Sequence, residues 1–216
     1  MDDRTIIVCG LPGMGKTTLL SKIATDSLNG KAFLDLPPHD KVYSTVAIPG
    51  CYELDPSMIG KFDFSNSLLL IDEVSQFFDA RDWKTFPKHI RTFFQIARHE
   101  HTSIVCCSQS WIDTDIRIRN LCYSIYLLKA IPFFDLSAVI PIRQKQDVIH
   151  GKLTEFQKKA GVLEWIFFSR KKYYSLFDSF CAYQQYEENT SEKYPGINYL
   201  VKCKKFKLIK KKKRSA

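Results

Sequence analysis

A glycine-rich stretch near the start of the chain constrains its fold more than any other feature. Residues 10–17 read GLPGMGKT and match G-x-x-x-x-G-K-[ST] at every fixed position. Such a loop turns successive backbone N–H groups inward around phosphate oxygens, and a following helix adds its positive dipole end. The apolar run 6–9 is typical of a buried strand, and residues 17–24 are typical of a helix. This order of strand, loop and helix predicts a Walker A loop rather than a chance glycine turn.

The loop pattern assigns roles to its own residues. Lys16 is expected to reach the β- and γ-phosphates, and the Thr17 hydroxyl to bind Mg²⁺. The predicted cofactors are therefore ATP and Mg²⁺. The residues predicted to bind the nucleotide are Gly10, Leu11, Pro12, Gly13, Met14, Gly15, Lys16, Thr17 and Thr18.

A second buried strand carries the acidic residues that a nucleotide hydrolase needs. Residues 68–71 read LLLI and run directly into Asp72 and Glu73. Asp72 is expected to hold Mg²⁺ through water or through Thr17, and Glu73 to polarise the attacking water. This pair favours hydrolysis over simple nucleotide binding, although a purely structural acidic pair is the alternative.

A third apolar run, residues 103–108, ends at Gln109. A polar side chain at the tip of this strand can sense the γ-phosphate or the attacking water, or it can merely cap the next helix. Between the two strands, residues 85–98 have a helical period. Their apolar face is Phe86, Ile90, Phe93, Phe94 and Ala97, and the opposite stripe is Lys84, Lys88, Arg91, Gln95 and Arg98. This stripe is either solvated or faces DNA or a neighbouring subunit.

The positive charge of the chain is concentrated at one end. The formal net charge is +9, and residues 202–214 contain nine Lys or Arg and no Asp or Glu. The rest of the chain is balanced, because 32 − 9 leaves 23 basic residues against 23 acidic ones. Such a tail is expected to bind nucleic acid or an acidic membrane surface, unless it only solubilises the chain.

Cysteine usage and hydropathy indicate the host cytoplasm. The seven cysteines include no C-x-x-C pair, which predicts reduced core thiols rather than disulfides or a zinc site. The most apolar stretch, about residues 121–142, carries Lys129, Pro132 and Asp135 and does not predict a membrane span. With no signal peptide evident, we expect a cytoplasmic protein that associates peripherally with the membrane, if at all, through the basic tail.

Two stretches together resemble a known family. SLLLIDEVSQFF and IARHEHTSIVCCSQSWIDTDIRIRNL resemble the zonular-occludens-toxin-like ATPases, the assembly proteins of filamentous phages, within the FtsK- and HerA-like DNA-pumping motors. The resemblance extends over about residues 4–180 and includes the pairs Arg98-His99 and Ser108-Gln109. It implies a homo-oligomeric ring in which an arginine from one subunit completes the site of its neighbour, with Arg117, Arg98 and Arg119 as candidates. It also implies DNA as a partner, with a single-stranded viral genome favoured, and virion or membrane assembly proteins as further partners.

Buried strands that alternate with helices predict an α/β P-loop NTPase fold, a mostly parallel sheet with helices on both faces. Further strands are expected at residues 43–48, 121–129 and 162–168, and the polar stretch 140–161 predicts a hairpin or an insertion. We expect an ATPase domain over 1–182, a polar linker over 183–195 and a basic tail over 196–216. The favoured function is an ATP-hydrolysing motor for DNA packaging, extrusion or virion assembly. The alternatives are an NTP-dependent switch or membrane-associated adaptor, and a nucleotide kinase.

Overall fold

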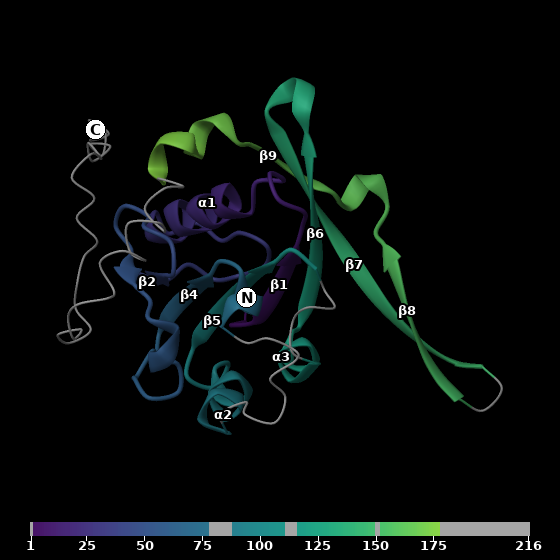
Figure 1. Cartoon of the computed structure of the whole chain (residues 1–216), viewed down its shortest axis with the longest axis horizontal. Helices are drawn as coiled ribbons and strands as arrows, with labels where there is room; N and C mark the ends of the chain where they lie inside the picture. The colour runs from purple at the N-terminus through teal and green to yellow at the C-terminus, as the bar shows by residue number, and fades with distance from the viewer. Residues whose placement is uncertain (1, 78–87, 111–115, 150–151, 178–216) are drawn as a thin grey trace.

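The computed structural model describes residues 2–77, 88–110, 116–149 and 152–177. They form one mixed β-sheet with parallel central strands and helices on both faces (Figure 1). The prediction of a mostly parallel α/β fold is therefore confirmed. The expected domain boundary at residue 182, the linker and the basic tail lie outside the described residues.

The strands are β1 Thr5–Cys9, β2 Lys41–Ser44, β3 Tyr52–Glu53, β4 Ser67–Ile71, β5 Thr102–Ser108, β6 Ser124–Ile131, β7 Leu136–Ile149, β8 Lys152–Lys159 and β9 Ile166–Ser169. The α-helices are α1 Lys16–Leu28, α2 Lys88–Ile96 and α3 Ile116–Leu121. Short 3₁₀ helices are η1 Pro56–Met58, η2 Val74–Gln76, η4 Pro132–Phe134, η5 Val162–Glu164 and η6 Lys171–Leu176.

The strand order places three functional segments at one edge of the sheet. The order is β3-β2-β4-β5-β1-β6-β7-β8, with β9 also paired to β7. Neighbours from β3 to β6 run parallel, whereas β7 is antiparallel to β6, β8 and β9. Strand β5 thus lies between β1, which precedes the glycine loop, and β4, which precedes the acidic pair. The carboxyl ends of all three strands meet at the same edge.

Alternating side chains of the central strands fill two separate cores. On β1, Ile6 and Val8 pack into a cluster under α1, while Ile7 and Cys9 join the cluster under α2 on the other face. Figure 1 shows α1 on one side of the sheet and α2 with α3 on the other. The continuous apolar runs of β1, β4 and β5 follow from this burial on both faces.

Helix α2 has the buried apolar face and the exposed polar stripe that its sequence predicts. Its residues Ile90, Phe93 and Phe94 are buried, and Ala97 just beyond it is buried as well. The polar stripe of Lys88, Arg91, Gln95 and Arg98 is exposed. The first part of the predicted helix, residues 85–87, lies outside the described residues, as do Lys84 and Phe86.

Several predicted boundaries are wrong by a few residues for local reasons. Strand β2 stops at Ser44, whose hydroxyl accepts a hydrogen bond from the Val46 N–H (3.1 Å) and so turns the chain. The run 162–168 divides into η5 and β9, and β6 begins only at Ser124 because α3 extends to Leu121. The polar stretch 140–161 lies in a hairpin of β7 and β8, which confirms one of the two expected forms.

No helix within the described ranges combines the length and the apolar character that a membrane crossing requires.

Candidate functional site

The glycine loop connects the carboxyl end of β1 to the first residue of α1. Gly13 and Gly15 have φ angles of 78° and 96°, in the left-handed region where a side chain is disfavoured. Helix α1 begins at Lys16, so the N–H groups of its first turn have no partner within the helix. The loop and the helix terminus together form a concave set of N–H donors suited to phosphate oxygens.

The other loop residues fit this geometry. Thr18 is buried at the start of α1, and Leu11 is 66% exposed at the outer rim of the loop. The Lys16 Nζ donates a hydrogen bond of 2.7 Å to the Gly10 carbonyl, so its ammonium group lies across the loop. From this position it can exchange a carbonyl partner for phosphate oxygens, because both are acceptors.

Thr17 and Asp72 come together across the two strand ends. The Thr17 hydroxyl donates a hydrogen bond of 2.7 Å to Asp72 Oδ2, and the Asp72 N–H donates one of 2.8 Å to Thr45 Oγ1. Burial raises the pKa of the Asp72 carboxyl, although the Thr17 hydrogen bond and the Lys16 charge oppose that shift. A hydroxyl and a partly desolvated carboxylate in direct contact fit the oxygen ligands that Mg²⁺ prefers.

Glu73 and Gln109 lie beside each other at the ends of β4 and β5. Glu73 Oε1 accepts hydrogen bonds from the Gln109 backbone N–H (3.2 Å) and from Ser75 Oγ (2.8 Å). The Glu73 backbone has a φ of 51°, a left-handed conformation that is uncommon for a residue with a side chain and that occurs often at functional sites. The Gln109 backbone thus connects the end of β5 to Glu73, and Gln109 also lines a cavity with Gly10 and Leu11 of the loop.

Of the candidate arginines, the structure places the side chain of Arg98 away from this group. Arg98 is exposed and follows α2, at the amino-terminal edge of the sheet, where it lines a cavity with Asp3, Gln95 and Tyr123. Arg117 lies in α3, of which only the backbone is described at that position. Any role for Arg98 in hydrolysis would therefore concern the site of another subunit, as the resemblance implies. Residues 111–115, which precede Arg117 in the family-like segment, lie outside the described residues.

Sequence reasoning missed a second layer of contacts around the glycine loop. Ser137 Oγ on β7 donates a hydrogen bond of 2.8 Å to the Met14 carbonyl. Arg170, directly after β9, donates a hydrogen bond of 3.4 Å from Nη1 to the Gly13 carbonyl. We name Ser137 and Arg170 the loop clamp. Neither residue carried a signal in the sequence, because each is more than 120 positions from the loop. Ser137 is a single hydroxyl inside an apolar run, and Arg170 resembles an ordinary surface residue.

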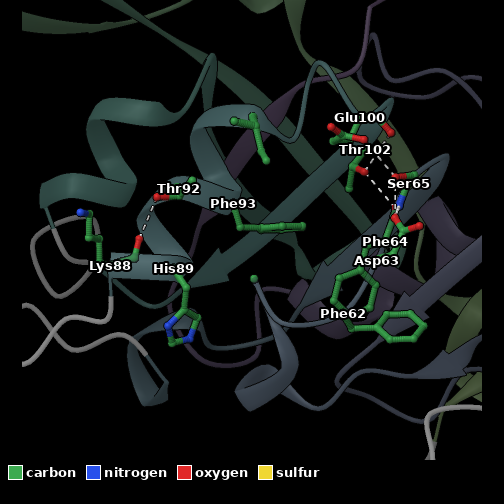
Figure 2. A pocket seen from close by; sticks show the side chains of 12 residues that line it. Phe62, Asp63, Phe64, Ser65, Lys88, His89, Thr92, Phe93, Glu100 and Thr102 are labelled. Carbon is green, nitrogen blue, oxygen red and sulfur yellow. Dashed lines mark hydrogen bonds between the residues drawn. The ribbon is translucent and has the colours of Figure 1, made fainter.

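A large apolar cavity lies elsewhere, at the opposite edge of the sheet. It measures about 660 Å³, and Figure 2 shows Phe62, Phe64 and Phe93 along its wall. Thr102 and Glu100 close it near the start of β5, where Thr102 Oγ1 donates a hydrogen bond of 2.9 Å to the Phe64 carbonyl. Among the residues that the structure describes with their side chains, no member of the predicted catalytic set lines this cavity, so it is distinct from the phosphate loop.

Comparison with protein-family models gives one match. Residues 1–135 match the model of the zonular occludens toxin (Zot) family. This segment includes the glycine loop, the acidic pair, Gln109 and Arg117. A comparison with curated protein sequences found no match to the chain.

The solved structures to which this chain is similar include one from this family. The N-terminal domain of zonular occludens toxin from Neisseria meningitidis superposes with a TM-score of 0.54 at 15% identity, over 82% of this chain and 100% of that chain. The genome packaging NTPase B204 from Sulfolobus turreted icosahedral virus 2, in complex with ATP-gammaS, gives a TM-score of 0.42 at 12% identity over 61% of this chain and 77% of that one. A KaiC-like protein from Pyrococcus horikoshii gives 0.45 at 8% identity, over 72% and 90%.

Proposed function

The chain belongs to the zonular occludens toxin (Zot) family, and from this premise we propose that it is a phage-type ATPase that hydrolyses ATP to drive DNA packaging, extrusion or virion assembly. The observation that carries the proposal is the meeting of three strand ends at one phosphate loop. There the Thr17 hydroxyl contacts Asp72, and Glu73 lies beside Gln109. A hydrolase needs this combination, because its base has to stand next to the metal-binding carboxylate.

Each group has a distinct task in the proposed reaction. The loop N–H groups and Lys16 bind the phosphates, and Thr17 with Asp72 would hold Mg²⁺, which neutralises charge on the β- and γ-phosphates when it is bound. Among the described residues, the Glu73 carboxylate accepts hydrogen bonds on Oε1 alone, and Oε2 would accept the water proton. Gln109 orients the same water or the γ-phosphate from β5. Its backbone N–H fixes the position of Glu73.

The proposal extends to assembly and to partners. We propose a homo-oligomeric ring in which Arg98 or Arg117 of one subunit approaches the γ-phosphate held by the next. A viral genome, single-stranded DNA by preference, passes along the ring, and the basic tail binds DNA, a membrane surface or a virion protein. Arg98 is exposed at the edge of the sheet opposite the phosphate loop of its own subunit. This position supports a contact with the nucleotide site of a neighbouring subunit.

The decisive experiment measures ATP hydrolysis with and without single-stranded and double-stranded DNA. Wild type is compared with Glu73→Gln and with Glu100→Gln, a matched change of an exposed carboxylate at the far edge of the sheet. DNA-stimulated turnover that is lost in Glu73→Gln and kept in Glu100→Gln is the expected result. ATP binding with negligible turnover in either condition would support a switch or adaptor instead, and phosphoryl transfer to a nucleoside monophosphate would support a kinase.

The ring has a separate test in mixtures of inactive variants. Glu73→Gln subunits lack the base, and Arg98→Ala or Arg117→Ala subunits lack a candidate arginine. Mixing the two restores some intact interfaces, so activity should return in the mixture if that arginine acts on a neighbouring site. If neither arginine variant loses activity alone, the proposed contribution from the neighbour is wrong.

A further inference from the structure

The direction of a bound nucleotide follows from the strand order. The groups that the proposed reaction places at the γ-phosphate, Asp72, Glu73 and Gln109, follow β4 and β5, which lie to one side of β1. The glycine loop that follows β1 would hold the β-phosphate. The α-phosphate and the nucleoside must therefore extend to the other side of β1, toward β6, the turn between β6 and β7, and β9.

Arg170 lies on that side, outside the ring of phosphate-binding N–H groups. Its guanidinium group contacts the Gly13 carbonyl. Because the C=O and the N–H of a trans peptide unit point in opposite directions, this contact lies on the side of the loop away from that unit's N–H group. A Cβ added at Gly15 would come within 3.1 Å of Arg170 Cδ, so the stem of the arginine lies against the outer wall of the loop. The guanidinium group is therefore next to the path of the nucleoside and not in the phosphate chamber.

The hydrogen-bonding capacity of Arg170 is poorly used. Its side chain is only 13% exposed, its bond to the Gly13 carbonyl is 3.4 Å long, and its Nη2 lies 3.6 Å from Asp135 Oδ1. The buried Nε has no hydrogen-bond partner among the described residues. Leaving a buried guanidinium under-satisfied is costly, which points to a ligand that supplies acceptor atoms at this position.

Exposed aromatic side chains stand beside Arg170. Phe133 and Phe134 in η4 are 93% and 72% exposed, and Tyr174 in η6 is 45% exposed. The Tyr174 hydroxyl donates a hydrogen bond of 3.3 Å to Asp135 Oδ1, and the Arg170 N–H donates one of 2.8 Å to the Asp135 carbonyl, so η4 and η6 are tied together at Asp135. Figure 1 shows η6 over α1, near the turn between β6 and β7. A flat aromatic surface next to a nucleotide site suits stacking of a base.

We propose that η4, Asp135, Arg170 and η6 form the nucleoside half of the site, in which Arg170 donates to the ribose and the aromatic side chains of η4 stack on the base. This inference rests on the proposed nucleotide binding and adds the part of the ligand that the Walker residues do not contact. It also explains the loop clamp, because Arg170 connects the nucleoside position to the Gly13 carbonyl.

The test compares a ligand that has a nucleoside with one that lacks it. Binding of Mg-ATP and of Mg-tripolyphosphate is measured by calorimetry for wild type, Arg170→Ala and Lys61→Ala, a change of an exposed cation outside this site with the same loss of charge. A charged hydrogen bond is worth about 1.5–3 kcal/mol, so Arg170→Ala should weaken ATP binding by roughly 10- to 100-fold. Tripolyphosphate affinity should stay within about twofold, and Lys61→Ala should bind both ligands as wild type does.

Other outcomes distinguish the possible errors. If Arg170→Ala loses affinity equally for ATP and for tripolyphosphate, Arg170 contacts the phosphates. If its affinity for both ligands is unchanged, Arg170 has only a structural role. Either result overturns the inference and leaves the proposed ATPase function in place. If wild type binds no ATP, the proposed function fails as well. If Arg170→Ala does not fold, Phe134→Ala tests the nucleoside site instead, because the exposed Phe134 side chain can be removed without loss of packing. Phe134→Ala should weaken ATP binding and spare tripolyphosphate, and equal affinities would refute the stacking.

Discussion

Two glycines of the phosphate loop should respond differently to the same substitution. Gly13 and Gly15 both have positive φ angles, but a Cβ at Gly13 would meet no atom within 4 Å. At Gly15 it would lie 3.0 Å from Ser137 Oγ and 3.1 Å from Arg170 Cδ. Both of these side chains are held by the loop itself, through the Met14 and Gly13 carbonyls. Alanine at position 15 therefore has to displace one of them.

The magnitudes follow from these contacts. A left-handed alanine costs about 1–2 kcal/mol relative to glycine, so Gly13→Ala should lower the free energy of unfolding by about that amount. Gly15→Ala adds an overpacking cost of about 1–3 kcal/mol, which brings its total to roughly 2–5 kcal/mol. Gly161→Ala is the control, because Gly161 has a φ of −60° and open space around the Cβ position. It should be neutral or stabilising by about 0.4–1 kcal/mol.

Urea unfolding without nucleotide measures all three changes, provided that the slope of free energy against urea stays constant. Ser137→Ala supplies a second check, because removing the hydroxyl relieves one of the two close contacts. The loss caused by Gly15→Ala should be smaller in that background by about 1 kcal/mol. If Gly13→Ala and Gly15→Ala destabilise equally and Ser137→Ala does not change the difference, the loop clamp does not exist as described.

Three further predictions concern buried ionisable groups. Burial lowers the pKa of His39 below 6.5, so the unfolded chain takes up the proton first, and the free energy of unfolding should fall as the pH drops below about 6.5. Urea unfolding of His39→Gln between pH 8 and pH 5 should show a smaller decrease in the free energy of unfolding than wild type does. An equal decrease in both proteins would contradict the lowered pKa of His39. Burial raises the pKa of the Asp72 carboxyl, so the free energy of unfolding falls as rising pH ionises this group. Asp72→Asn should therefore have a higher melting temperature than wild type near pH 7 without ligand. The same variant should lose any Mg²⁺-dependent shift of the melting temperature in the presence of ATP. Burial raises the pKa of Cys9 to about 11 and those of Cys51 and Cys106 to about 12, and it raises that of Cys107 as well. A Cys122→Ser/Cys181→Ser/Cys203→Ser variant, which keeps only these four buried thiols among its seven cysteine positions, should therefore react with a thiol reagent at pH 8 only after unfolding. Rapid labelling of the folded variant would be inconsistent with these buried thiols.

The local motifs could be predicted from the sequence because each follows a buried strand. Continuous apolar runs mark β1, β4 and β5, and the residue after each run falls at the carboxyl edge of a parallel sheet. The approach of Asp72 to Thr17 follows from that rule alone, as does the position of Gln109. The individual roles of these residues in catalysis stay predictions until turnover is measured.

The loop clamp could not be predicted, because tertiary pairing produces it. Ser137 reaches Met14 only because β7 pairs antiparallel with β6, which in turn lies beside β1. Arg170 stands in the run SRKK, which looks like a solvated surface in the sequence. No spacing rule connects such positions to a loop near residue 13.

The strand order also has a consequence for how the molecule is assembled during folding. Strand β1 finds its partners far along the chain, since Thr5 pairs with Ile104 and Ile6 with Ser124. Closing loops of this length is slow and raises the contact order, whereas β6, β7 and β8 pair with near neighbours and can form early. The nucleotide loop, which follows β1, is thus among the last segments to become structured. A ligand that recognises the finished loop therefore cannot guide early folding, and instead stabilises a chain that has already closed its sheet.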